Sequence, residues 1–329
     1  MVSEISYQKT SVFLIGLGAI GMGYDYSDSN SMGISHARAI EKHPDFFCIG
    51  AFDLDKEKSI QFEKQFSVKT FDSLEVGLLE CKPEVVIIAT PTKEHLLTLI
   101  EVLRNCIPLV ILCEKPLAID AKTGESFLKS ARAAKVPVFV NYFRNSAQST
   151  LDIKEHISTG VFKQPFYGKC QYNKGALNTA SHFLNMFELW FGSDFIFKMT
   201  DQFPNPNDKS DPNVSGELVF PGGVISIQPD LSEQELIFEA QVNFENGVLF
   251  YSNEGEIIRW IPRAGSYLSL NDHRNSTIEF ATSLKDYQYH VMTELSKFLH
   301  DKPHNLCDVA SALDYVVKLS QREARGLHG

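Results

Sequence analysis

The sequence predicts an α/β protein in two parts: a doubly wound parallel sheet, then an α+β part with a mostly antiparallel open sheet. Three observations predict this fold class. A glycine-rich turn follows the first apolar run, at residues 16–21. Short apolar runs then alternate with helical patterns as far as about residue 145, which is typical of strands joined by crossover helices. After residue 147 the apolar runs are separated by short turns such as 221–223, Pro-Gly-Gly, which favours antiparallel pairing.

The glycine-rich turn reads Gly-Leu-Gly-Ala-Ile-Gly and directly follows a predicted buried strand at 12–15. Glycine lets the chain turn tightly, lets backbone N–H groups approach a pyrophosphate, and lets a helix pack close to the sheet. The N-terminus of the helix that follows would present partial positive charge to the phosphates. The pattern predicts a dinucleotide-binding (Rossmann) fold. The residues expected at the cofactor are Gly16, Gly18, Ala19, Ile20 and Gly21.

A second predicted strand, 47–52, ends at Asp53. An acid at this position can accept hydrogen bonds from the adenosine ribose, which favours NAD over NADP. Asp53 lies 32 positions after Gly21, whereas the usual spacing is roughly 20. The extra residues form the polar segment 24–33, after which a helical pattern resumes. We predict an inserted loop near the phosphates, either a solvated surface loop or a lid over the cofactor.

The remaining elements follow from periodicity and turn signals. In the first part, we predict strands at 83–89, 109–113 and 136–140 and helices at 96–103 and 121–134. In the second part, we predict helices at 151–158, 180–191, 286–300 and 308–325, and strands at 166–174, 216–220, 224–228, 236–244, 248–252, 256–261 and 277–282. The expected domains are a dinucleotide-binding domain, 1–146, and a substrate-binding and oligomerisation domain, 147–329. The reaction is expected in the crevice between them.

Composition excludes several classes of function. The chain has 329 residues and a net charge of −10 without a basic run, which argues against a nucleic-acid partner. It begins with a polar segment, and no apolar stretch approaches the length of a membrane span, so we expect no membrane partner. The six cysteines show neither paired nor metal-binding spacing, which predicts reduced thiols in a cytoplasmic protein and no metal site.

Three more segments accompany the glycine turn. They are Ala-Thr-Pro-Thr-Lys-Glu-His at 89–95, Cys-Glu-Lys-Pro-Leu-Ala at 113–118, and Gly-Ala-Leu-Asn-Thr-Ala-Ser-His at 175–182. Their order and spacing resemble the Gfo/Idh/MocA oxidoreductases, closely over 11–145 and beyond that through the last segment and the strand pattern.

The resemblance implies an NAD(H)-dependent enzyme that moves hydride between nicotinamide and a hydroxyl-bearing carbon of a sugar, cyclitol or nucleotide sugar. It also implies a homodimer or homotetramer through the C-terminal sheet. It places Thr90, Pro91, His95, Glu114 and Lys115 at the cofactor. For His95, a structural role at a helix terminus stays an open alternative.

Lys115 is the first candidate catalytic residue. It follows a predicted strand at the ligand-binding edge of the sheet, and the residue before a proline is held extended, which can aim it into the crevice. An ammonium group there can hydrogen-bond a reacting hydroxyl and offset developing negative charge. A lone lysine at a strand end is otherwise an exposed surface residue, and the resemblance favours the catalytic role.

His182 is the second candidate, because histidine exchanges a proton near neutral pH. It lies four positions after Asn178, a spacing that puts both on one helix face. Many catalytic members of the family carry Asp where Asn178 and Asn185 stand. Asparagine can bind a sugar hydroxyl but supplies no negative charge to a protonated histidine. Three alternatives therefore stay open: Lys115 carries more of the proton transfer, His182 works with another partner, or catalysis is weak.

The candidate substrate-binding residues are Asn178, Tyr142, Arg144 and Tyr172. Arg144 offers a planar fork suited to phosphate, although a solvated arginine after a strand is an equal alternative. Two rival functions also remain. One is another reductase of the same family, acting on dihydrodiols or imines; the other is a dinucleotide-binding regulator without turnover, which the substitution at Asn178 keeps open.

Overall fold

The computed structural model describes residues 9–232, 235–263, 277–282 and 284–320, which form two compact units. The first unit consists of residues up to 146 together with 285–313, and the second of residues 147–284 and those from 314 onward. The chain thus returns to the first unit near its end. The predicted boundary between two domains at residues 146 and 147 does not account for this return.

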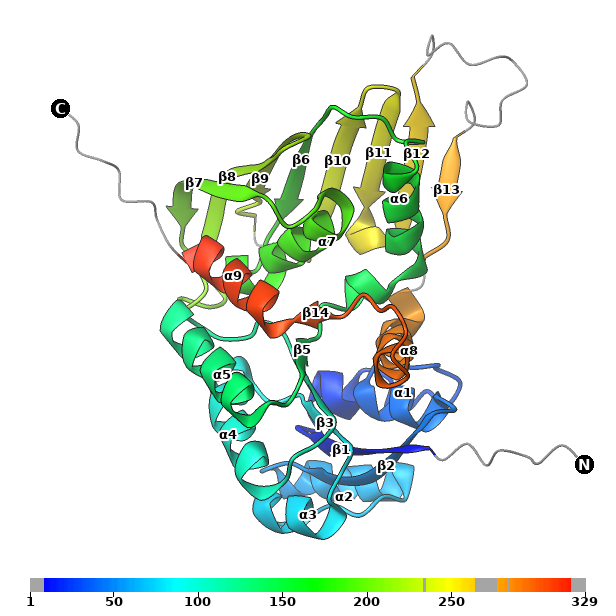
Figure 1. The fold of residues 1–329 in the computed structure, drawn as a ribbon, viewed down its shortest axis with the longest axis vertical. Helices are drawn as coiled ribbons and strands as arrows, with labels where there is room; N and C mark the ends of the chain where they lie inside the picture. Colours follow the sequence, from blue (N-terminus) through cyan, green and yellow to red (C-terminus); the bar gives the residue numbers. More distant parts are fainter. Residues whose placement is uncertain (1–8, 233–234, 264–276, 283, 321–329) are drawn as a thin grey trace, which may run out of the picture. The chain divides into compact units, whose positions relative to one another are not determined.

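A six-stranded sheet in the order β14-β5-β4-β3-β1-β2 forms the centre of the first unit (Figure 1). All neighbouring pairs are parallel except β14 with β5. The strand order reverses at β1, between β2 and β3, and ligands bind such sheets at the carboxyl ends beside this switch point. The predicted doubly wound sheet is confirmed. Its strands are β1 (Thr10–Ile15), β2 (Phe46–Phe52), β3 (Val85–Ile88), β4 (Val110–Cys113), β5 (Val138–Val140) and β14 (Cys307–Asp308).

The continuous apolar runs of β1, β3 and β4 are buried throughout, as expected of parallel strands covered on both faces. The helix α8 returns the chain to this core, where Val291, Met292 and Leu295 are fully buried. Its placement differs from the predicted 147–329 domain, because its apolar face packs in the first unit. The helices of the first unit are α1 (His36–Lys42), α2 (Lys56–Phe66), α3 (Leu74–Cys81), α4 (His95–Asn105), α5 (Ala121–Ala134) and α8 (Tyr287–Leu299).

The second unit is built on an eight-stranded sheet in the order β13-β12-β11-β10-β6-β9-β8-β7. Only β6 and β9 pair in parallel, so the predicted mostly antiparallel sheet is confirmed. The strand β7 was not predicted, because polar residues interrupt its apolar pattern. The strands are β6 (Phe166–Tyr172), β7 (Ile196–Phe203), β8 (Asn213–Phe220), β9 (Gly223–Pro229), β10 (Phe238–Phe244), β11 (Gly247–Ser252), β12 (Ile257–Pro262) and β13 (Ile278–Phe280).

The helix α7 (Ser181–Phe191) lies against this sheet (Figure 1). Aromatic side chains fix it there. Phe183 stacks on Phe238 with ring centroids 3.8 Å apart, and Phe191 stacks on Phe166 at 3.9 Å. Burial of each such ring contributes about 1.5–3 kcal/mol. The packing holds the helix that carries His182. The other helices are α6 (Gln148–Ser158) and α9 (Val309–Ser320), and the end of the predicted helix 308–325 lies outside the described residues.

Two absences hold for the described parts of the chain. No helix there is long and apolar enough to cross a membrane. No group of three or more His, Cys, Asp or Glu side chains there is arranged to hold a metal ion. The six cysteines are all free thiols.

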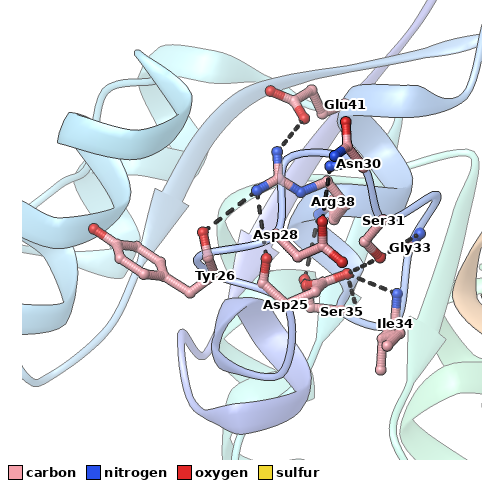
Figure 2. Close-up of polar contacts among 10 residues, drawn as sticks. All are labelled: Asp25, Tyr26, Asp28, Asn30, Ser31, Gly33, Ile34, Ser35, Arg38 and Glu41. Carbon is pink, nitrogen blue, oxygen red and sulfur yellow. Dashed lines mark hydrogen bonds and ion pairs between the residues drawn. The ribbon is translucent and has the colours of Figure 1, made fainter. Parts of the chain in front are cut away.

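The inserted segment between the glycine turn and α1 is a folded loop with its own polar centre, the Asp25 carboxylate (Figure 2). The Asp25 carboxylate accepts hydrogen bonds from the Ser31 hydroxyl at 2.7 Å, the Ile34 N–H at 2.8 Å and the Ser35 hydroxyl at 2.5 Å. The buried Arg38 guanidinium donates to the Asp25 carbonyl oxygen at 3.4 Å. The loop is therefore more ordered than a solvated surface segment. That it forms a lid stays a prediction.

Asp25 gives this loop a pH-dependent stability. Burial alone would raise the pKa of Asp25, but hydrogen bonds from Ser35, Ser31 and Ile34 hold it below the ordinary value. A depressed carboxyl pKa contributes stability above the unfolded-state pKa, and this contribution is lost as the pH falls through the folded-state pKa.

We predict that Asp25→Asn lowers the free energy of unfolding by about 1–3 kcal/mol at neutral pH, because an amide oxygen cannot replace two ionised acceptor oxygens. Urea unfolding of wild type and variant at neutral pH and near pH 3 checks this. The gap should narrow in acid, because the stabilisation by the ionised carboxylate is lost progressively as the pH falls from the unfolded-state pKa through the lower folded-state pKa. Equal stability of the two proteins at neutral pH would contradict the prediction.

Candidate active site

The three glycines of the turn have different roles. Gly16 has a φ of +96°, and a Cβ there would lie 2.5 Å from the Ala89 carbonyl oxygen. A Cβ on Gly21 would lie 2.1 Å from the Gly16 carbonyl oxygen. Both glycines are therefore required by the fold itself. A Cβ on Gly18 would meet nothing within 4 Å, so this glycine borders an open space at the carboxyl edge of the sheet.

The helix predicted directly after the glycines is a single π-type turn, Ala19–Gly23, in which the Gly23 N–H donates to the Gly18 carbonyl oxygen at 3.1 Å. The α-helix α1 begins only at His36, where Ser35 caps it. This corrects the prediction of a helix N-terminus behind the glycines. The inserted loop separates the turn from α1. Phosphate contacts from this segment would therefore come from N–H groups of the turn and not from the start of an α-helix.

Asp53 ties the end of β2 to the glycine turn. Its carboxylate accepts a hydrogen bond from the Leu17 N–H at 2.6 Å and another from the Asp55 N–H at 2.8 Å. These bonds use different oxygens, and an ionised carboxylate has about four acceptor positions. Asp53 therefore retains acceptor capacity that suits ribose hydroxyls.

His95 links the loops that follow β3 and β4. Its buried ring lies 2.9 Å from the Thr90 carbonyl oxygen through Nε2 and 3.3 Å from the Leu117 carbonyl oxygen through Nδ1. Burial lowers the pKa of His95 despite these contacts. This geometry supports the structural alternative for His95. Beside it, the buried Thr90 hydroxyl oxygen has no hydrogen-bond partner among the described residues.

Glu114 ends β4 with a buried carboxylate. One oxygen accepts from His36 Nε2 at 2.7 Å and from Asn141 Nδ2 at 2.6 Å, and the other accepts from the Lys115 N–H at 3.3 Å. Burial would raise the pKa of Glu114, but the bonds from His36 and Asn141 and the nearby Lys115 charge hold it below the ordinary value. Lys115 is half-buried, and its peptide bond to Pro116 is cis. The predicted cofactor residues and Lys115 thus meet at one sheet edge.

This edge fits a dinucleotide. The space beside Gly18 would be filled by a Cβ, Asp53 has free acceptor positions, and the Thr90 hydroxyl is an unpaired polar atom in the described structure. These are the features that pyrophosphate, ribose and nicotinamide groups need from a protein edge.

In the second unit, Asp211 caps the turn that leads into α7. Its carboxylate accepts from the Leu177 N–H and the Asn178 N–H, both at 2.8 Å. Gly175 has a φ of +103°, and a Cβ there would lie 2.0 Å from the same carboxylate. The sequence reasoning missed Asp211, because no local pattern connects it with a turn more than thirty positions away.

His182 and Asn178 do not share one environment. His182 is buried, with its ring edge-on to Phe238 at 6.2 Å, whereas Asn178 is exposed and donates to the Lys174 carbonyl oxygen at 3.2 Å. The chain passes through a π-type turn, Ala176–Ala180, before α7 begins. The two residues thus differ in exposure, and a common helix face for them stays a prediction.

Tyr172 requires a correction, because its hydroxyl is part of the sheet. It donates to the Val214 carbonyl oxygen at 2.8 Å and accepts from the Val214 N–H at 2.6 Å. Burial raises its pKa far above the ordinary value. Tyr142 and Arg144 are also buried, and the Arg144 guanidinium lies 4.7 Å from the centre of the Phe143 ring.

A second polar network on α7 was not predicted. Asn185 donates to the Tyr315 hydroxyl at 3.3 Å, and that hydroxyl donates to the Glu188 carboxylate at 2.9 Å. Glu188 thus supplies this helix with a carboxylate, although neither Asn178 nor Asn185 does.

Comparison with known proteins identifies the class. Residues 12–142 match the model of the Gfo/Idh/MocA family, described as an oxidoreductase family with an NAD-binding Rossmann fold. Over this part, which is less than half of the chain, the sequence matches the NAD-binding Rossmann fold of the Gfo/Idh/MocA oxidoreductases. No curated protein sequence matches the chain.

Solved structures show that the whole chain has the fold of such proteins. An oxidoreductase from Desulfitobacterium hafniense, described as NADPH-dependent, is 14% identical with a TM-score of 0.75, over 96% of this chain and 95% of that one. The WlbA dehydrogenase of Bordetella pertussis, solved with NADH and UDP-GlcNAcA, is 17% identical with a TM-score of 0.70, over 95% and 94%. An inositol dehydrogenase homologue from Azotobacter vinelandii, solved with NADH and myo-inositol, is 16% identical with a TM-score of 0.70, over 97% and 96%.

We predict that Gly18→Val abolishes NADH binding and leaves the protein folded. The backbone of Gly18 is extended with a negative φ, and its Cβ position is open, so valine is accommodated but occupies the space that a pyrophosphate needs. NADH fluorescence titration with circular dichroism checks this. Gly23→Ala is the control, because its Cβ would make only a 3.4 Å contact at an exposed position. Unchanged NADH affinity in folded Gly18→Val would exclude this glycine from the site.

Proposed function

We propose that the chain is an NAD(H)-dependent dehydrogenase of a sugar, cyclitol or nucleotide sugar. The observation that carries the proposal is the half-buried Lys115, whose backbone N–H donates to the buried Glu114 carboxylate at the sheet edge that also carries Gly18 and Asp53. We propose this edge as the dinucleotide site. The similar folds solved with NADH and myo-inositol or UDP-GlcNAcA support this substrate class.

In the proposed reaction, the bound nicotinamide accepts or supplies hydride. The chain's own residues place the substrate carbon and handle the proton. The Lys115 ammonium donates a hydrogen bond to the reacting oxygen and stabilises the negative charge that develops there. His182 is proposed to exchange the proton. This role requires the two units to bring His182 to the same substrate as Lys115, which is part of the proposal.

We predict that Lys115→Ala lowers kcat about 100- to 1,000-fold, because one lost charge-stabilising donor typically has this effect. NADH affinity should stay within about threefold.

We also predict that His182→Ala lowers the rate of sugar oxidation. In wild type this rate should rise with pH as a histidine-like group loses its proton, and this rise should disappear in the variant. Initial rates of NAD⁺ reduction with myo-inositol and UDP-GlcNAcA across pH measure both effects. Normal turnover in Lys115→Ala would remove Lys115 from the mechanism.

The proposed cofactor is NAD(H) and not NADP(H). The fold does not decide this, because one similar structure is described as NADPH-dependent. The Asp53 carboxylate would repel a 2′-phosphate at close range. Lys56, the cation nearest in sequence, lies 3.5 Å from Asp72 in an exposed ion pair.

Parallel titrations with NADH and NADPH check this preference. We predict at least tenfold tighter binding of NADH by wild type, and a clearly smaller ratio in Asp53→Asn, which removes the charge and keeps an acceptor oxygen. Equal or tighter NADPH binding by wild type would overturn the proposal.

A dinucleotide-binding regulator without turnover is the second candidate. The exposed Asn178 and the buried Asn185 favour it, because neither supplies the carboxylate that would stabilise a protonated His182. NADH binding without turnover of any sugar, cyclitol or nucleotide sugar would support the regulator.

We also propose a homodimer or homotetramer formed through the open face of the second unit's sheet. One cross-strand row on this face is largely apolar, with Tyr167 61%, Ile196 57% and Ile261 44% exposed. A row of this kind on a sheet face is suited to burial against a second copy. The apolar members are Ile196, Val219, Val224, Tyr167, Val248 and Ile261.

Sedimentation velocity tests this assembly. Wild type should exceed the 37.0 kDa of one chain, and the double variant Val224→Glu with Tyr167→Glu should sediment as a monomer with unchanged circular dichroism. A monomeric wild type would overturn the assembly.

The free cysteines support a reducing compartment, and we propose the cytoplasm.

A further inference from the structure

A buried hydrogen-bond network joins the inserted loop to the loop that carries Lys115, entirely within the first unit. The Gln288 N–H donates to the Gly33 carbonyl oxygen at 3.0 Å, and the Gln288 side-chain oxygen accepts from Asn141 Nδ2, also at 3.0 Å. Asn141 gives its second amide hydrogen to Glu114 at 2.6 Å. His36 completes the network on the same carboxylate oxygen, at 2.7 Å.

The partners of His36 determine which of its nitrogens carries the proton. Nε2 lies against the carboxylate of Glu114 and must donate to it, because an ionised carboxylate only accepts. Nδ1 is buried and has no hydrogen-bond partner among the described residues. A proton on Nδ1 would leave a buried donor unsatisfied, which is costly. The geometry therefore places a proton on Nε2, where it is donated to Glu114.

We propose that His36 is a positioning residue for Lys115 and acts through Glu114. This inference rests on the proposed function of Lys115. His36 and Asn141 supply the two side-chain donors that make a buried anion tolerable at the end of β4. The anion in turn holds the Lys115 backbone N–H and lies close to its ammonium charge.

Removal of the His36 donor favours protonation of Glu114, because a buried carboxylate with fewer donors loses its preference for the charged form. Neutral Glu114 no longer attracts the Lys115 ammonium group, which becomes easier to deprotonate. Several titratable groups face the Glu114 carboxylate. They are His36 on α1, Lys115 and Cys113 beside it in the chain, His95 on α4 and Tyr287 on α8.

The test compares His36→Leu, which removes the donor, with His36→Gln, whose amide can still donate. His43→Leu is the matched control, because His43 is a buried histidine at the end of α1 that contacts Thr293 and not Glu114. The first readout needs no turnover: acetic anhydride labels Lys115 across pH, and mass spectrometry measures the labelled peptide. The second readout is kcat and KM for myo-inositol and UDP-GlcNAcA, with NADH affinity measured separately.

We expect the pH of half-maximal Lys115 labelling to fall by about one unit in His36→Leu, and kcat to fall about tenfold or more, with KM and NADH affinity within about threefold. His36→Gln should restore both readouts toward wild type. If His36→Leu does not fold, His36→Asn, whose shorter side chain does not reach Glu114, takes its place.

Labelling and kcat in His36→Leu equal to those of His43→Leu would overturn the positioning role. A wild type that turns over neither probe would count against the proposed function alone, because the labelling comparison still reports whether His36 controls Lys115.

Discussion

The buried carboxylate of Glu114 is the interaction on which the first unit's site depends. A carboxylate in an apolar interior is unfavourable unless donors surround it. Here the donors come from α1, from the end of β5 and from the Lys115 backbone. The need to satisfy one charge therefore draws the start of α1 and the carboxyl ends of two strands to the same point. Lys115 lies at this point because it is the next residue in the chain.

A second carboxylate has the corresponding role in the other unit. Asp211 satisfies the first N–H groups of the turn before α7, which would otherwise lack acceptors. It requires glycine at position 175, because any side chain there would collide with the carboxylate. Aromatic stacking on the sheet then fixes the helix. His182 thus lies on a helix that follows a turn held by Asp211 and that packs against the sheet.

Departures from regular structure gather near these sites. The turn after the first strand is of π type, and a second π-type turn precedes α7. Turns of this type are frequent at functional sites. The inserted loop follows the first of them and is organised by Asp25 and Arg38.

The sequence by itself determined the fold class and the sheet edge that is predicted to bind the cofactor. Apolar runs such as β3 have only one suitable environment, a sheet covered on both faces, and glycines such as Gly16 and Gly21 are required wherever a side chain would collide with backbone. These constraints are local, so a pattern along the chain reveals them.

Only the tertiary structure decided which polar groups meet. The pairing of His36 with Glu114 spans 78 positions, and Gln288 reaches Asn141 across 147. Three further features depend on such distant contacts. They are the hydrogen bonds of Tyr172 within the sheet, the burial of His182 beside an exposed Asn178, and the packing of α8 in the core of the first unit. Hydrogen-bond partners are chosen by proximity in the folded chain, and periodicity in the sequence carries no record of that proximity.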